Sequence, residues 1–155
     1  MACKCKNGST RQDFLTPVPG GTAADATYLL GLTHFNCGNT KILVDENDFP
    51  VIANLNIQSV GTPVFVGNAD NQAYCAPVKI GGTVTYRPAC GCRTESDIIS
   101  ETVYVPCSST TVPTVTLGTV QASPVPTEYY SGCCRRVYPL SNTIALTTSL
   151  NVTTA

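Results

Sequence analysis

From residue 40 onward, apolar and polar residues alternate in short runs that are separated by turn residues. The runs are TKILVD, VIANLNIQSV, GTPVFVG, YCAPVKI, TVTYRPAC, IISETVYVPC and TVPTVTLGTVQA, the last of which is interrupted by Pro113 and Gly118. A period of two residues indicates strands with one buried face. We therefore predict an all-β, single-domain, jelly-roll-like β-sandwich of roughly eight strands, with a hairpin turn at Gly81-Gly82.

The two ends of the chain have patterns of their own. Residues 1–21, MACKCKNGSTRQDFLTPVPGG, are polar and then broken by Pro and Gly, which predicts a flexible N-terminal arm before a sandwich domain at residues 22–155. The run TAADATYLLGLTHF fits either a helix or a strand. The last run, VYPLSNTIALTTSLNVTTA, carries no charge, which predicts a strand paired on both edges. It could lie within a sheet or against another subunit, and burial of both faces favours the centre of a sheet.

The low charge of the chain narrows the classes of partner. Charged residues make up 12% of the 155 residues, and the formal net charge is -1. Lys and Arg are scattered, so no basic surface for nucleic acid is expected. No apolar run approaches the length of a membrane span, about 18 residues. Because little charge repulsion opposes association, the composition favours a subunit that assembles with copies of itself.

Nine cysteines are many for a protein that stays in a reducing cytosol. The start of the chain lacks the apolar core of a signal peptide, so we expect a protein made inside a cell and oxidised after release. Nine is odd, and internal pairing alone leaves one thiol over. We interpret Cys3 and Cys5 as donors of intersubunit disulfides. The candidate acceptors or internal bridges are Cys37, Cys75, Cys90, Cys92, Cys107, Cys133 and Cys134.

Catalytic chemistry has little support in the sequence. His34 is the only histidine and lies three residues before Cys37. A nucleophilic relay would have to be built on this pair, whereas a lone histidine among apolar residues is more often packed or exposed. We therefore predict no enzyme, no catalytic residue and no cofactor.

The spacing of the acidic residues and of the cysteines argues against a metal site. Asp45, Glu46 and Asp48 lack the glycine and the terminal glutamate of an EF-hand, so a solvated turn is the better interpretation. Cys3-Lys4-Cys5 and Cys90-Gly91-Cys92 place one residue between their thiols, whereas structural zinc sites use two to four. No metal site is predicted, and a small cysteine-rich metal-binding domain remains an alternative.

The cysteine pair directly after the start, the spacer and the Thr/Val-rich β domain with further cysteines resemble the subunits of bacterial endospore appendages. The resemblance implies a jelly-roll domain that stacks head to tail into a filament. It implies that Cys3 and Cys5, on an N-terminal connector, bond to neighbouring subunits as disulfides. It also implies an extracellular or spore-surface location and a spore-coat or exosporium protein as anchor. Sheet-forming spore proteins and a phage capsid-decoration or tail protein are the alternatives.

Overall fold

The computed structural model describes residues 9–18, 25–35, 42–43, 51–66, 74–86, 94–107, 109–124, 128–131, 137–141 and 143–153. Every regular element in these ranges is a strand, so the prediction of an all-β fold is confirmed. The strands are β1 (Ser9–Val18), β2 (Asp25–Phe35), β3 (Ile42–Leu43), β4 (Ile52–Val60), β5 (Val64–Phe65), β6 (Tyr74–Tyr86), β7 (Glu95–Cys107), β8 (Thr114–Leu117), β9 (Gln121–Pro124), β10 (Glu128–Ser131), β11 (Val137–Ser141) and β12 (Thr143–Thr153).

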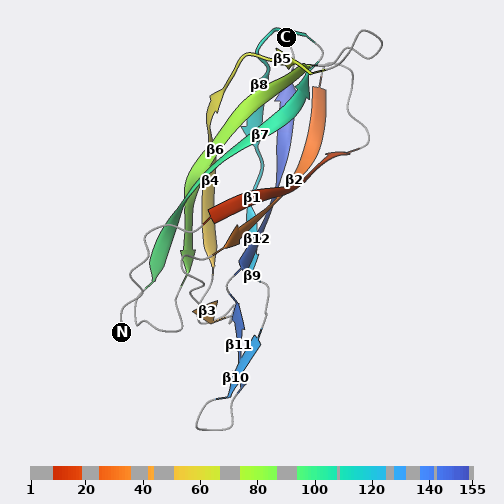
Figure 1. Cartoon of the computed structure of the whole chain (residues 1–155). Helices are drawn as coiled ribbons and strands as arrows, with labels where there is room; N and C mark the ends of the chain where they lie inside the picture. The colour runs from red at the N-terminus through yellow and green to blue at the C-terminus, as the bar shows by residue number, and fades with distance from the viewer. Residues whose placement is uncertain are drawn as a thin grey trace.

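Nine of these strands form two antiparallel sheets that pack as a sandwich (Figure 1). The five-stranded sheet has the order β1-β2-β12-β8. β9 pairs with the same edge of β12 as β8 does, at residues nearer the start of β12. In the four-stranded sheet, β4 and β5 pair with successive stretches of one edge of β6, and β7 pairs with the other edge. A small separate sheet consists of β10, β11 and β3. The predicted sandwich of about eight strands is thus confirmed.

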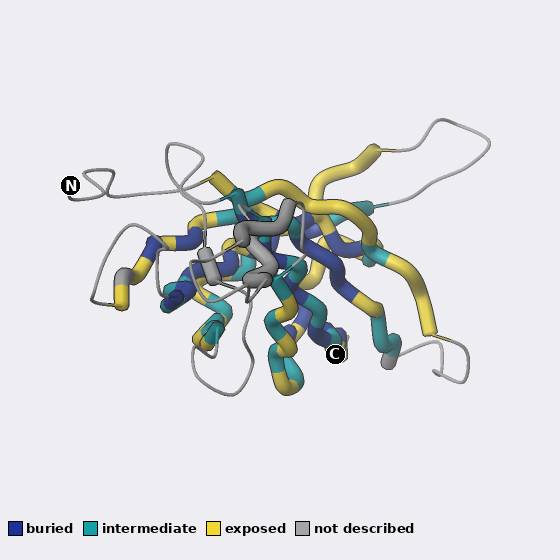
Figure 2. Tube along the Cα trace, turned by 90° about the horizontal axis from the view of Figure 1, so that it is seen from below, coloured by how far each residue is buried: buried dark blue, intermediate teal, exposed yellow. Residues whose placement is uncertain are grey.

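The core lies between the two sheets and is filled by every second residue of the long strands. Figure 2 shows this alternation of buried and exposed positions along the chain. Burying one face of each sheet removes large apolar side chains from water, which is the main stabilising term of such a fold. The fully buried large side chains of this core include Leu30, Leu32, Val78, Ile80, Val84, Tyr86, Ile99, Val103, Val105, Ile144, Leu146 and Leu150.

The run at residues 22–35, open between helix and strand, forms β2 over its described part. Leu30 and Leu32 are buried, whereas Leu29 is exposed, which is the period of a strand. The neutral C-terminal run forms β11, in the small separate sheet, and then β12. β12 pairs with β2 along one edge and with β8 and β9 along the other. The prediction of a strand paired on both edges is confirmed, and both edges are satisfied within the chain.

The predicted turn at Gly81-Gly82 was wrong, because both glycines lie inside β6, which pairs with β4 and β7 on its two edges. Gly82 has φ +152°, and a Cβ atom there would collide with the backbone carbonyl of Asn54. At Gly81 a Cβ atom would meet the side chain of Gln58. Glycines inside a strand can mark a close approach of neighbouring groups as well as a turn, and here they mark the former.

The N-terminal run also contains a strand. Residues 9–18, which lie within the predicted arm, form β1 and pair with β2 at the edge of the five-stranded sheet. Residues 1–8 and 19–21 of the predicted arm lie outside the described residues. In the described part of the chain, no helix is long and apolar enough to cross a membrane.

Candidate functional site: a buried polar network and two thiols

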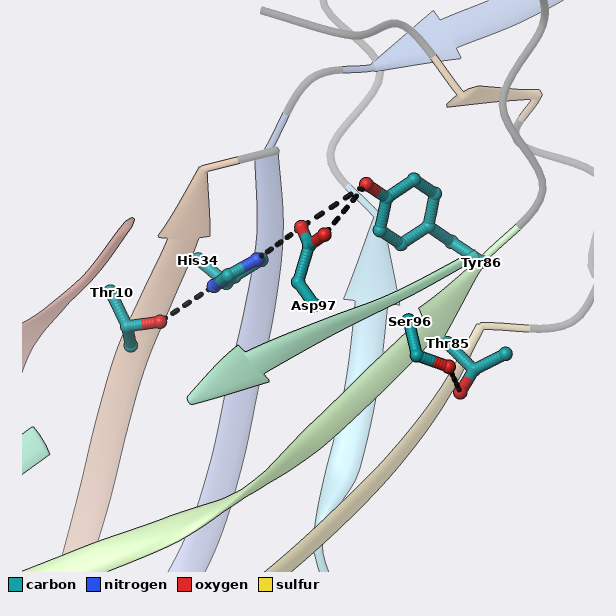
Figure 3. A network of polar contacts seen from close by, with 6 residues as sticks. All are labelled: Thr10, His34, Thr85, Tyr86, Ser96 and Asp97. Atoms are coloured by element: carbon teal, nitrogen blue, oxygen red, sulfur yellow. Dashed lines mark hydrogen bonds and ion pairs between the residues drawn. The ribbon is translucent and has the colours of Figure 1, made fainter. Parts of the chain in front are cut away.

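Four polar side chains meet inside the sandwich and connect its two sheets (Figure 3). Thr10 Oγ1 lies 2.6 Å from His34 Nδ1, and His34 Nε2 lies 2.8 Å from Asp97 Oδ2. The hydroxyl of Tyr86 lies 3.1 Å from both carboxylate oxygens of Asp97. Because Thr10 and His34 belong to one sheet and Tyr86 and Asp97 to the other, the network ties the two layers together.

The strand period explains why these residues face one another. His34 continues the inward-facing row of Leu30 and Leu32 on β2, so its ring enters the core. Asp97 lies two residues before buried Ile99 on β7, and Tyr86 lies two residues after buried Val84 on β6. The network therefore occupies inward positions that elsewhere on the same strands carry apolar side chains.

The hydrogen bonds of the network form one consistent chain. An ionised Asp97 can only accept, so it accepts from the Tyr86 hydroxyl and from Nε2–H of His34. Nδ1 makes the second hydrogen bond of the ring, with the Thr10 hydroxyl, which can either donate or accept. Each of these polar groups thereby has a partner, which removes the penalty for burying it.

The order hydroxyl, imidazole, carboxylate is also that of a nucleophilic relay, in which the imidazole takes the proton of the hydroxyl. His34 is 0% and Asp97 1% exposed, and both are enclosed by core strands. Thr10, on the edge strand β1 that pairs with β2, is partly buried, but the ring and the carboxylate behind it are closed to solvent. This burial makes the network a structural tie between the sheets in the geometry shown.

Sequence reasoning singled out His34 but missed Thr10, Tyr86 and Asp97. The signal available for Asp97 was an acidic residue in phase with the inward row of Ile99 and Val103. The suggested pairing of His34 with Cys37 cannot be placed, because Cys37 lies outside the described residues. Of the predicted site residues, Cys3, Cys5, Cys90, Cys92, Cys133 and Cys134 also lie outside them.

Cys75 and Cys107 are the two cysteines in the described part of the chain, and both are free and partly buried. They lie on adjacent strands, where Cys75 faces Pro106 and Cys107 faces Tyr74 in the ladder. Cys75 alternates with buried Ala76 and so lies on the outer face of the sheet, whereas Cys107 continues the inward row that contains Val105. The two thiols are on opposite faces of the sheet, so the structure does not bring them together as a disulfide pair.

The inner thiol has a modified acidity. Burial raises the pKa of Cys107, nearby Cys75 raises it further, and a hydrogen bond from the backbone of Ala76 lowers it in part. Burial also raises the pKa of Tyr28, with smaller contributions from Cys107 and Cys75. A raised thiol pKa reduces the fraction of thiolate, which is the reactive form. The Cys107 thiol is therefore suited to packing rather than to exchange.

The outer thiol of Cys75 lies in an apolar part of the surface. Val64 and Pro106 are its ladder neighbours on the two sides, and Val64 is 58% exposed. Tyr104, which faces Pro77 in the next outward row, is 60% exposed. Large exposed apolar side chains grouped around one thiol are typical of surfaces that contact another molecule.

No protein-family model, no curated protein and no solved structure matches this chain. Among the described residues, no three His, Cys, Asp or Glu side chains gather in a group that could hold a metal ion. The functional interpretation therefore rests on the thiols, the surfaces and the network.

Proposed function

We propose that this protein is a structural subunit that assembles head to tail with copies of itself into an extracellular filament or appendage cross-linked by disulfides, as on a spore surface. Cys3 and Cys5 of one copy supply thiols, and Cys75 of another copy receives one of them. The single observation that carries this proposal is the Cys75 thiol on the outer face of the four-stranded sheet, beside the exposed apolar side chains of Val64 and Tyr104. Dissolved oxygen accepts the two electrons and two protons released when each disulfide forms.

The position of Cys75 favours a bond between copies over a bond within one chain. Thr10 is tied through His34 to Asp97 at one end of β7, whereas Cys75 faces Pro106, nine residues further along that strand. Nine strand residues span about 30 Å. From Thr10, the chain to Cys5 reaches at most about 18 Å, and a disulfide adds a Cα–Cα distance of about 6 Å. Cys5 thus falls short of Cys75 of its own chain.

Cys3 is two residues further from Thr10 and reaches at most about 25 Å before the disulfide is added. That length matches the separation only along a straight line through the packed core. Because Cys75 lies on the outer face, a real path must pass around the edge of the sheet and is longer. A neighbouring copy has no such restriction.

The remaining outer surface of the four-stranded sheet supports assembly as well. Its outward positions on β4 and β7 are mostly neutral polar residues, among which Ile52 and Ile98 are 51% and 61% exposed. In the described part of the chain, β7 pairs with β6 on one edge only, so its other edge presents unpaired backbone groups. Neutral faces and long open edges favour association between copies.

The proposal is tested on native material by gel electrophoresis with and without a reductant, together with electron microscopy. We expect a high-mass ladder that collapses to monomer only after reduction, and regular polymers in the images. A Cys3→Ser, Cys5→Ser double variant should fold but give polymers that dissociate in denaturant. Monomers in both lanes, or an unchanged resistance of the double variant, would contradict the proposal.

A further inference from the structure

Strand β1 is held to the sandwich differently from the other long strands. Eight of its ten residues are exposed, and only Thr10 and Leu15 are partly buried. It pairs through one edge, with β2, and its register is broken by a bulge between Gln12 and Phe14. Strands with little buried surface open at a lower free energy than the core does.

The side-chain contacts between β1 and β2 are specific, although β1 buries little surface. The ring of Phe14 lies over Gly31, where any side chain would collide with it. The guanidinium of Arg11 lies 5.0 Å from the centre of the Phe35 ring. Two residues before Phe35 on β2, the Thr33 hydroxyl donates to the carboxylate of Asp13. This carboxylate also forms an ion pair with Arg11.

At the start of β1, the hydroxyl of Thr10 completes the buried network through its hydrogen bond with Nδ1 of His34. When β1 leaves, His34 loses this partner, so the state in which the edge of β2 is unpaired is unfavourable. Pairing with a strand of the same sequence restores the lost hydrogen bond. All these contacts join β1 to residues of β2. They can be made equally well by the β1 of any copy of this chain.

The chain around β1 is suited to such an exchange. Thr16 and Val18 each precede a proline, and residues in that position are restricted to extended backbone. A released β1 therefore keeps part of its extended form, which lowers the entropy lost when it pairs again. Exchange of an identical element between copies replaces each contact by the same contact, so it requires little free energy.

We propose that β1 is an exchangeable strand, which leaves its own β2 and pairs in the same register with the β2 of a second copy. The exchange links two copies without a covalent bond. It is independent of the disulfide chemistry of the proposed function, so it is tested in the Cys3→Ser, Cys5→Ser variant.

The experiment mixes equal amounts of this variant labelled with ¹³C and with ¹⁵N. After incubation at high concentration, we expect a nuclear Overhauser contact between the ¹³C-labelled Phe14 ring and the ¹⁵N-labelled amide of Gly31, which can only arise between copies. Light scattering should show a matching dimer or oligomer. The time that the β1 amides need for full exchange is measured on a separate sample in deuterated water. Absence of the contact in ordinary water after a longer incubation than this would overturn the proposal.

A matched pair of substitutions tests the role of the network in this exchange. Thr10→Val removes the hydroxyl that hydrogen-bonds His34. The rate at which the contact between copies appears should rise about fivefold, as expected for one lost hydrogen bond. Thr16→Val changes an exposed residue of the same strand and should leave the rate unchanged. Both variants are shown to be folded by circular dichroism. Equal exchange rates for the two would show that the hydrogen bond between Thr10 and His34 does not slow the release of β1.

Discussion

At the scale of single residues, the molecule depends on a few buried polar atoms that have partners. Asp97 accepts from Tyr86 and from His34, which come from different sheets, and it is 1% exposed. Removing the carboxylate takes a buried hydrogen-bond partner from both residues, which is more costly than losing an exposed ion pair. The exposed pair of Arg11 and Asp13 offers the comparison within the same chain.

We expect Asp97→Ala to lower the free energy of unfolding by about 3 kcal/mol, the range found when one partner of a buried pair is removed. Asp13→Ala, whose charge pair is at the surface, should lower it by less than about 1 kcal/mol. Urea titrations followed by circular dichroism measure both values. Similar losses for the two variants would show that the network does not stabilise the sandwich.

The charge of a second acidic residue on β7 gives a pH dependence. Glu101 faces buried Ile80 in the ladder, and partial burial raises the pKa of its carboxyl. A raised pKa means that the folded state holds the proton more tightly than the unfolded chain. The stabilising contribution is therefore complete below the unfolded pKa, about 4.3, and is lost as the pH rises through the folded value.

Glu101→Gln, which cannot ionise, should consequently be more stable than the parent protein at pH 7. The expected gain is up to about 0.5 kcal/mol, as is usual for a residue that is only partly buried. The gain should disappear near pH 3, where the parent carboxyl is protonated in both states. Denaturant unfolding at the two pH values measures it, and a difference that does not vary with pH would refute the electrostatic explanation.

At the scale of strands, the sequence was informative wherever one face is buried and the other is not. Gly31 and Thr33, which are poor helix formers, were enough to raise a strand as an option at β2. The absence of charge located the central strand β12. Gly81 and Gly82 were misassigned, because contacts with another strand decide their role and these contacts are not visible in the local sequence. The polar network was missed for the same reason, since its members are distant along the chain.

The two glycines of β6 make a matched pair of substitutions. Gly82→Ala places a Cβ atom against the backbone of Asn54 at a positive φ, and we expect a loss of about 2 kcal/mol or more. Gly81→Ala meets only the side chain of Gln58, which can turn aside, so its loss should be smaller. Thermal unfolding of the two variants compares them. Equal losses would indicate that β4 does not approach β6 closely at Gly82.

At the scale of the whole molecule, the two ends of the sandwich have different parts in the proposed assembly. The end with Thr10, His34 and Asp97 fixes the strand from which the N-terminal cysteines extend. The opposite end of β6 carries Cys75 on its outer face. A donor and an acceptor at opposite ends of one subunit generate a chain of subunits in which each contact repeats the last, because a head-to-tail interface need not close.

This separation predicts complementation between two variants that each lack one half of the bond. Copies with Cys3→Ser and Cys5→Ser keep the acceptor Cys75, and copies with Cys75→Ser keep the donors. When the two are mixed and oxidised, peptide mapping by mass spectrometry should find Cys75 bonded to Cys3 or Cys5, a bond that neither variant forms alone. The control is a Cys107→Ser variant with all other cysteines present. It should form the same polymer as the parent protein, because the Cys107 thiol points inward and has a raised pKa. Recovery of Cys75 as a free thiol from the mixture, or a Cys3–Cys75 bond within a monomer, would contradict the head-to-tail linkage.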